Sequence, residues 1–288
     1  MKILLLGKDG QLGRALEARL RRVGEITSWG RDDADFLKPL QLRDLVLATK
    51  ADVIVNAAAY TAVDQAESEP ELAHAINGVA PAVLAKAALD IGCKLIHYST
   101  DYVFDGSSDT PWTENSPTSP INVYGQSKLA GEQAIQNSGC QHLIFRTSWV
   151  YAKEGNNFAK TMLRLAQERD ALSVIDDQIG APTDAAWLAD ITAQVIASPI
   201  SGLFHAVPAG ETSWHGYASY LIAKARAMGF PIKVSPKSIR AVASSEYVTA
   251  AKRPHSSRLD CSKLTTIFGI TLPPWQQGID QLLEHLKP

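Results

Sequence analysis

A tyrosine and a lysine stand four residues apart, at Tyr124 and Lys128, in a stretch whose pattern predicts a helix over 122–138. Positions i and i+4 share one face of a helix, so the two side chains are expected to be neighbours. A cationic lysine favours the phenolate and lowers the pKa of a tyrosine from about 10, which makes the phenol a workable general acid for protonating a carbonyl as hydride arrives. The spacing is common by chance, and an exposed surface pair is the alternative.

A threonine at the end of a predicted strand supplies a third group for the same chemistry. Thr100 follows the apolar run Leu95–Tyr98, and its hydroxyl could hydrogen-bond the carbonyl oxygen that the tyrosine protonates. Ser99 is the competing hydroxyl. Together with Tyr124 and Lys128, this threonine predicts the reduction of a carbonyl group.

A glycine-rich turn, Gly7-Lys8-Asp9-Gly10-Gln11-Leu12-Gly13, lies between the apolar run Ile3–Leu6 and a helical pattern of leucines. Its spacing is GxxGxxG rather than GxGxxG, but the glycines still let the backbone turn tightly and approach a pyrophosphate at the start of the following helix. Gly13 would allow the helix to pack closely on the strand. The turn therefore predicts a dinucleotide site, with an ordinary glycine turn as the alternative.

The end of the second predicted strand bears on the choice between NADH and NADPH. An acidic residue for the adenosine ribose is expected about 20 residues after the glycine turn, but the sequence there reads Gly30-Arg31. Arg31 favours NADPH, because an arginine beside the ribose accommodates a 2′-phosphate. A solvated loop charge is the alternative, and either of the next two aspartates could be the missing acid. Asp35 and Phe36 are expected at the adenine, with Asp35 accepting from its exocyclic amine.

Short apolar runs alternate with helical patterns in the first half of the chain, which predicts an α/β fold: a Rossmann-type doubly wound parallel sheet. The runs are Ile3–Leu6, Val53–Val55, Leu95–Tyr98, Leu143–Phe145 and, more weakly, Glu25–Trp29, and helices are predicted over 69–91 and 122–138. After about residue 148 the alternation loosens, with helical patterns at 156–169, 184–197, 213–228 and 275–286. We expect an NAD(P)-binding domain over 1–148 and a smaller, mainly substrate-binding lobe over 149–288, interleaved with the first.

Composition narrows the functional class. The formal net charge of −2 and the 45% apolar content argue against a strongly basic nucleic-acid binder and against a disordered chain. Cys93, Cys140 and Cys261 form no CxxC pair, so free thiols in a reducing compartment are expected. The apolar start is too short for a signal peptide, and we expect no stretch to reach the roughly 18 apolar residues of a membrane span. The sequence therefore predicts a soluble cytoplasmic protein without nucleic-acid or membrane partners.

Four motifs occur in the order typical of one family. The glycine turn, Asn56–Ala59, Ser99–Asp101 and the Tyr124/Lys128 pair resemble the extended short-chain dehydrogenase/reductase family. Longer stretches resemble the members of this family that reduce 4-keto sugars carried on dTDP. These stretches are Asn56–Asp64, Ser99–Gly106, Arg146–Tyr151, Gly155–Phe158, Asp177–Gln178, Gly180–Thr183, Arg253–Pro254 and Ser257–Asp260.

The resemblance implies the last step of dTDP-L-rhamnose synthesis, in which NAD(P)H reduces the 4-keto group of dTDP-4-dehydro-L-rhamnose. It implies a catalytic set of Thr100, Tyr124 and Lys128, with Lys128 also gripping the nicotinamide ribose. With the motifs above, the expected cofactor-binding residues are Gly7, Gly10, Gln11, Leu12, Gly13, Arg31, Asp35, Phe36, Ala59, Tyr60, Thr61, Tyr124 and Lys128. The expected substrate-binding residues are Thr100, Asp101 and Trp149, although Trp149 could instead belong to the core.

Several alternatives stay open. NADPH is the expected cofactor, and Arg31 puts NADH use in doubt without excluding it. Some relatives hold a metal between subunits with glutamates near the first helix, but Arg14 and Ala15 offer no such ligand here, so we expect no metal and leave a homodimer open. His97 is interpreted as a core histidine, and Arg253 as either a diphosphate ligand or a solvated loop charge. The alternative functions are a reductase of a related 4-keto nucleotide sugar and a non-catalytic regulatory subunit on the same fold.

Overall fold

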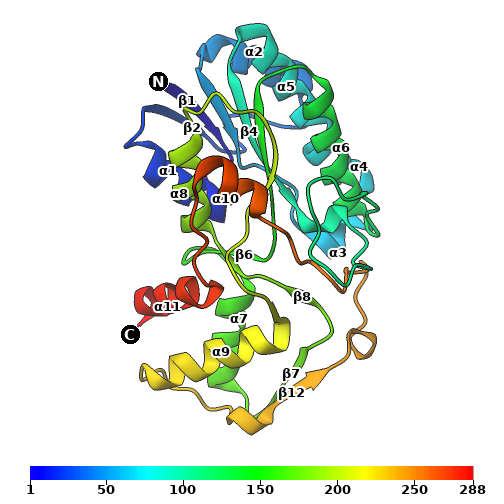
Figure 1. Ribbon diagram of the computed structural model, residues 1–288, viewed down its shortest axis with the longest axis vertical. Helices are drawn as coiled ribbons and strands as arrows, with labels where there is room; N and C mark the ends of the chain where they lie inside the picture. The colour runs from blue at the N-terminus through cyan, green and yellow to red at the C-terminus, as the bar shows by residue number, and fades with distance from the viewer. Residues whose placement is uncertain (288) are drawn as a thin grey trace.

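The structure, a computed structural model, describes residues 1–287 and is built around one six-stranded sheet in which every neighbouring pair of strands is parallel (Figure 1). The spatial order is β10-β5-β4-β3-β1-β2. The doubly wound parallel sheet predicted from the sequence is confirmed. Its strands are β1 (Lys2–Leu6), β2 (Glu25–Trp29), β3 (Val53–Asn56), β4 (Lys94–Thr100), β5 (His142–Thr147) and β10 (Gly202–His205).

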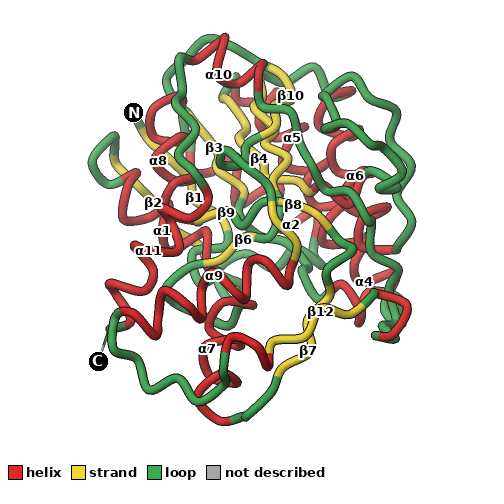
Figure 2. The backbone as a smooth tube through the Cα atoms, turned by 60° about the horizontal axis from the view of Figure 1, so that its bottom comes forward, coloured by secondary structure: helices red, strands yellow, loops and turns green. Residues whose placement is uncertain are grey.

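Successive residues of the central strands enter two different cores, because side chains alternate across a sheet. Ile3 and Leu5 of β1 pack in a core with helices α1 (Gln11–Leu20) and α8 (Ala185–Val195). Leu4 and Leu6 pack in a second core with α2 (Pro39–Thr49) and α5 (Ala80–Ile91). Figure 2 shows α1 and α8 on one side of the strands and α5 with α6 (Val123–Asn137) on the other. A strand that is buried on both faces is apolar along its whole length, so such strands can be predicted from continuous apolar runs in the sequence.

One helical segment corrects an expectation from the sequence. Residues 70–91 form a continuous helical stretch from α4 (Pro70–His74) through a π-helical turn, η1 (Ala75–Val79), to α5. By length and composition alone it could cross a membrane, so the expectation that no stretch is long and apolar enough was wrong. Half of the apolar 18-residue window within it is buried, with α5 packed against both α2 and α6, as in a core helix.

The second layer lies beyond the carboxyl ends of the strands, at the bottom of Figure 1. Its helices are α7 (Phe158–Glu168), α9 (Trp214–Ala227) and α11 (Trp275–Leu286). Three two-stranded pairs join them: β7 (Leu172–Ile175) with β12 (Ile239–Val242), β8 (Ile179–Gly180) with β11 (Thr212–Ser213), and β6 (Val150–Tyr151) with β9 (Thr183–Asp184). Helix α8, strand β10 and helix α10 (Ser262–Phe268) return to the sheet layer, so the chain after residue 148 contributes to both layers.

A buried ion pair joins helix α6 to strand β5. The Arg146 guanidinium donates to both carboxylate oxygens of Glu132, over 2.6 to 3.2 Å, and both side chains are nearly inaccessible to water. The face of the Phe104 ring covers the guanidinium, with 5.0 Å between its carbon and the ring centroid. Removing one partner of such a pair leaves an uncompensated buried charge.

We therefore expect Glu132→Ala to lower the free energy of unfolding by about 3–5 kcal/mol, as measured by urea denaturation. The matched control is Glu168→Ala, which breaks the exposed pair with Arg164 and should cost under about 1 kcal/mol. The double variant Glu132→Leu/Arg146→Met should recover much of the loss, because it removes both charges. Equal destabilisation by Glu132→Ala and Glu168→Ala would contradict this role of the buried pair.

Candidate active site

The carboxyl ends of the sheet strands open into a cavity of about 860 Å³. The tips of β1 to β5 and the loops that follow them form one wall, and Trp149, Asn156 and Trp214 lie on the side of the second layer. The sheet order reverses at β1, which lies between β2 and β3, and doubly wound sheets bind ligands at such a reversal. Every residue assigned to the site from the sequence lines this cavity except Gly13.

The glycine turn brings the ends of β1 and β3 into close approach. Gly7 has φ +84°, and a Cβ there would lie 2.6 Å from the backbone nitrogen of Ala58. A Cβ on Gly13 would lie 1.9 Å from the Gly7 carbonyl oxygen, so Gly13 permits packing of α1 rather than contact with a ligand. Gly10 is the N-cap of α1, and no side chain bonds the first N–H groups of this helix. Those N–H groups suit a phosphate.

The side chain of Gln11 contacts the second layer. Its Oε1 accepts hydrogen bonds from the backbone N–H of Ala152 at 3.0 Å and from Nδ2 of Asn157 at 2.9 Å. Asn157 also caps α7 through the N–H of Lys160. The Gln11 side chain therefore connects the glycine turn to the second layer. Its backbone N–H is the group that could bind a cofactor phosphate.

The adenosine end of the cavity contains Arg31, whose side chain is exposed, together with Asp35 and Phe36. Of the two aspartates left open as ribose ligands, Asp33 is already engaged: its carboxylate accepts from the Gly30 N–H at 2.8 Å and pairs with Lys8 at 2.6 Å. These two donors lower the pKa of Asp33. Asp32 does not line the cavity. The acidic contact typical of an NADH site is therefore not formed by either residue.

The catalytic triplet predicted from the sequence meets deep in the cavity. Tyr124 lies in the first turn of α6, which Asn122 caps by accepting from the Gly125 N–H at 2.7 Å. Thr100 ends β4, and its hydroxyl donates to Asp101 at 3.0 Å. Lys128, one turn further along α6, is 2% exposed. All three side chains line the same cavity, as predicted.

The pKa of Tyr124 moves in the direction opposite to the one expected. Burial of the phenol raises its pKa above the ordinary value, the charge of Asp101 raises it further, and a hydrogen bond with Thr100 opposes both. The sequence analysis expected Lys128 to lower this pKa, but the desolvation of a buried phenolate is the larger effect in this structure. Tyr124 is therefore protonated at neutral pH, which is the form that a general acid must have.

Burial brings the pKa values of Lys128 and of the neighbouring Asp101 carboxyl toward neutrality. Burial lowers the pKa of Lys128 to about 8, although the charge of Glu132 opposes this. Lys128 Nζ donates to the carbonyl oxygen of Tyr98 at 2.6 Å. Burial raises the pKa of Asp101 to about 6, against hydrogen bonds from Ser257 and Thr100.

Asn77, in the π-helical turn η1, holds the loop that lines the middle of the cavity. Its amide accepts from the N–H of Tyr60 and donates to the carbonyl of Tyr60, both at 2.9 Å, and also donates to Ser127 of α6 at 3.0 Å. Ala59, Tyr60 and Thr61 are thereby fixed beside the catalytic helix. Sequence reasoning missed Asn77, because nothing in its local pattern marks it.

Trp149 is held as one half of an aromatic pair. Its rings stack on Trp214 with 3.7 Å between centroids and 14° between planes. Trp149 has φ +48°, a conformation that is uncommon for a bulky residue, and a Cβ on Gly180 would lie 2.8 Å from its indole. Both tryptophans line the cavity, and Trp214 was missed because it lies 65 residues away in the sequence.

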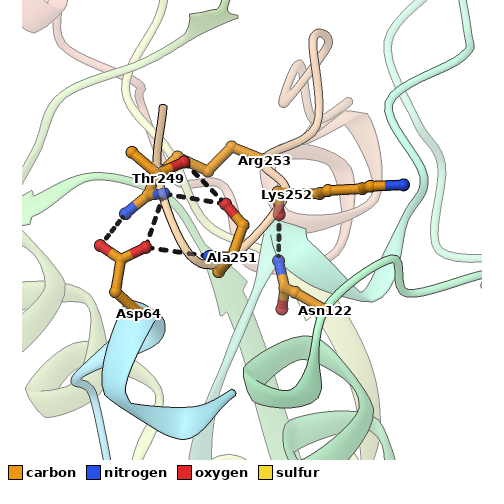
Figure 3. Close-up of polar contacts among 6 residues, drawn as sticks. All are labelled: Asp64, Asn122, Thr249, Ala251, Lys252 and Arg253. Atoms are coloured by element: carbon orange, nitrogen blue, oxygen red, sulfur yellow. Dashed lines mark hydrogen bonds and ion pairs between the residues drawn. The ribbon is translucent and has the colours of Figure 1, made fainter. Parts of the chain in front are cut away.

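The segment around residue 251 crosses to the sheet layer outside the cavity (Figure 3). Arg253 pairs with Asp64 of helix α3 (Val63–Ala66) at 2.6 and 3.0 Å, and the N–H of Ala251 donates to the same carboxylate. Asn122, at the start of α6, donates to the carbonyl of Lys252 at 2.8 Å. Arg253 is therefore neither a cavity residue nor a free loop charge.

Metal ligation was not expected from the sequence. Within residues 1–287, no three or more His, Cys, Asp or Glu side chains gather as a metal ion would require. The expectation that the protein needs no metal stays a prediction.

The chain is similar to known proteins along its whole length. A family model described as RmlD substrate binding domain matches residues 1–287. The dTDP-4-dehydrorhamnose reductase of Escherichia coli K12 is 48% identical over 99% of this chain and 98% of that protein. The one from Burkholderia thailandensis is 44% identical, with 99% of both chains covered.

Solved structures give the same result. The crystal structure of dTDP-4-dehydrorhamnose reductase from Bacillus anthracis in complex with NADP has a TM-score of 0.93 and 35% identity, with 99% of both chains covered. The structure from Clostridium acetobutylicum has a TM-score of 0.92 and 35% identity over the full length of both chains. With matches of this identity and coverage along its whole length, the chain belongs to the dTDP-4-dehydrorhamnose reductase family.

Proposed function

We propose that this protein uses NADPH to reduce the 4-keto group of dTDP-4-dehydro-L-rhamnose, giving dTDP-L-rhamnose. The observation that carries the proposal is one cavity with an uncapped helix N-terminus beside the glycine turn at one end and Thr100, Tyr124 and Lys128 at the other. Thr100 and Lys128 are buried, and Tyr124 is half-buried. A protein that only binds a nucleotide has no need of these three residues together. The names of the relatives supply the identity of the sugar.

The residues present fit a dinucleotide in that cavity. The first N–H groups of α1 suit the pyrophosphate, and Arg31 suits a 2′-phosphate. Asp35, Phe36 and the segment Ala59–Thr61 line the same cavity. We assign the first two to the adenine and the segment to the nicotinamide half. Ser99 Oγ and Thr147 Oγ1 are buried beside the cavity and have no hydrogen-bond partner within the protein. Both hydroxyl groups could therefore donate a hydrogen bond to a bound ligand. When bound, NADPH supplies the hydride.

The chain's own residues then handle the proton. Tyr124 donates its phenolic proton to the sugar oxygen as the carbonyl becomes an alcohol, and the Thr100 hydroxyl hydrogen-bonds that oxygen. Lys128 binds the nicotinamide ribose. Trp149, backed by Trp214, offers one flat face to the deoxysugar. Residues 1–148 mainly bind the cofactor and 149–288 mainly the substrate.

We place this activity in the cytoplasm. The support is that Cys93, Cys140 and Cys261 are all unpaired and buried, which suits a reducing compartment. The partner is a small molecule, the dTDP-sugar. A homodimer stays a prediction. Analytical ultracentrifugation tests it by measuring the mass of the protein in solution.

The direct test of the proposed function is NADPH oxidation by the purified protein in the presence of dTDP-4-dehydro-L-rhamnose. Sugar-dependent oxidation with release of dTDP-L-rhamnose is expected. NADPH binding without any sugar-dependent oxidation would favour the regulatory alternative. Oxidation with a different 4-keto nucleotide sugar only would favour a related reductase.

Tyr124→Phe should reduce turnover by about 10²–10⁴-fold, because it removes the proton donor. NADPH affinity, measured by fluorescence titration, should stay nearly unchanged. Tyr220→Phe is the matched control, since Tyr220 bonds Asp280 in the second layer and lies outside the cavity. Turnover above about a tenth of the wild-type rate in Tyr124→Phe would show that another group is the acid.

Arg31→Ala should raise the KM for NADPH by about 10–150-fold and leave the KM for NADH nearly unchanged. The reason is that a hydrogen bond to a charged group is worth about 1.5–3 kcal/mol. Arg22→Ala, at an exposed position after α1, should change neither constant. Equal effects of Arg31→Ala on both cofactors would mean that Arg31 has a structural role.

Trp149→Ala should lower kcat/KM for the sugar by about 10²-fold, because a substrate misplaced by about 1 Å reacts that much more slowly. NADPH affinity should hardly change, and dTDP should still inhibit competitively. Trp149→Phe keeps a flat ring against Trp214 and should lose less. A lower melting temperature with kcat/KM intact would instead make Trp149 a core residue.

A further inference from the structure

Three buried polar side chains form a line behind the catalytic cavity. Asn56 ends β3, His97 lies in the middle of β4 and Lys128 projects from α6. Asn56 Nδ2 lies 3.1 Å from His97 Nδ1, and His97 Nε2 lies 3.4 Å from Lys128 Nζ. The three residues are 1%, 1% and 2% exposed, so water cannot easily substitute for these contacts.

The orientation of the Asn56 amide is fixed by the backbone beside it. Its Oδ1 accepts a hydrogen bond from the N–H of Ala58 at 3.1 Å. The NH₂ group must therefore face His97, because turning the amide over would set two donors against each other at Ala58. An NH₂ group is a donor only, so His97 Nδ1 must be the acceptor.

This contact fixes the tautomer of His97. Burial and the neighbouring Lys128 charge hold the pKa of His97 well below its ordinary value, so the ring is neutral and carries one proton. With Nδ1 accepting, that proton is on Nε2 and points at Lys128 Nζ. An ammonium group has three donors and no acceptor, whereas a neutral amine has a lone pair that can accept this N–H.

We propose that His97, held in one tautomer by Asn56, is a positioning residue that weakens the proton affinity of Lys128 by directing an N–H group at its amine. His97 is thereby more than the core histidine suggested by the sequence. The inference rests on the proposed function only where turnover is measured, because the tautomer itself is a property of the resting protein.

The other charged and titratable groups around Lys128 do not supply this contact. Glu132, on the next turn of α6, favours the ammonium, but Arg146 of β5 already neutralises its charge. From β4, only the Tyr98 carbonyl accepts from Lys128. Tyr124 on α6 and Asp101 after β4 are the other titratable groups that line the cavity with Lys128. Beyond burial itself, His97 is the group among the described residues that places a ring nitrogen at hydrogen-bond distance from Lys128 Nζ.

The decisive measurement is ¹⁵N NMR of the protein with labelled histidine, with His97 assigned by the signals lost in His97→Gln. At pH 7 we expect Nε2 to carry the proton and Nδ1 to be bare. A proton on Nδ1, or on both nitrogens, would overturn the proposal. This result does not depend on any substrate, so it stands or falls separately from the proposed function.

The second measurement is the pKa of Lys128, followed by the ¹³Cε chemical shift. Replacing His97 removes the opposing N–H, so the ammonium becomes more stable and the pKa of Lys128 should rise by roughly one unit, a tenfold gain in proton affinity. His97→Leu tests this directly, and His97→Gln, whose amide oxygen can turn toward the ammonium, gives the same direction with a better-tolerated side chain. The alkaline limb of the kcat/KM profile should move to higher pH by the same amount.

His205→Leu is the matched control, because His205 is also a fully buried strand histidine in the same sheet but has no contact with Lys128. It should leave both the Lys128 pKa and the alkaline limb in place. An unchanged or lowered Lys128 pKa in the His97 variants, or an equal rise in His205→Leu, would contradict the proposal.

Discussion

The partial burial of Tyr124 and the nearly complete burial of Lys128 are the constraint on which the rest of the site depends. Removal from water favours the uncharged form of a phenol and of an amine. The surrounding groups therefore determine the pKa of each side chain. Lys128 donates a hydrogen bond to the Tyr98 carbonyl oxygen, and the ion pair between Glu132 and Arg146 lies one helical turn away. The same burial that makes these contacts costly also keeps the tyrosine protonated, which is what a proton donor to a sugar oxygen requires.

Two sets of hydrogen bonds connect the layers on either side of the residues that line the cavity. Gln11 joins the glycine turn to the loop before α7, and Asp64 joins helix α3 to Arg253 of the C-terminal segment. Both tie a part of the sheet layer to a segment from the second half of the chain. These contacts connect the glycine turn, where we propose that the cofactor binds, to the layer that carries Trp214. A fixed arrangement of cofactor and substrate favours a short and reproducible distance between reacting atoms.

The sheet and much of the site could be predicted from the sequence because their signals are local. The apolar run Ile3–Leu6, the glycine turn and the four-residue spacing of Tyr124 and Lys128 each depend on near neighbours in the chain. What could not be predicted depends on distant contacts: strand β10 joining β5, Trp214 stacking on Trp149, and the Gln11 side chain turning toward Ala152. The sign of the Tyr124 pKa shift belongs to this second group, because it follows from burial, which spacing alone does not reveal.

Hydride delivery to one carbon of the sugar, with the proton supplied by the protein, can be followed directly with NADPH deuterated at the transferable position of the nicotinamide. The product formed from dTDP-4-dehydro-L-rhamnose is then analysed by NMR. We predict dTDP-L-rhamnose that carries deuterium on C4 of the sugar. The proton of the C4 hydroxyl group should exchange with solvent. Deuterium at any other carbon, or a sugar that takes up none while NADPH is consumed, would contradict the proposed reaction.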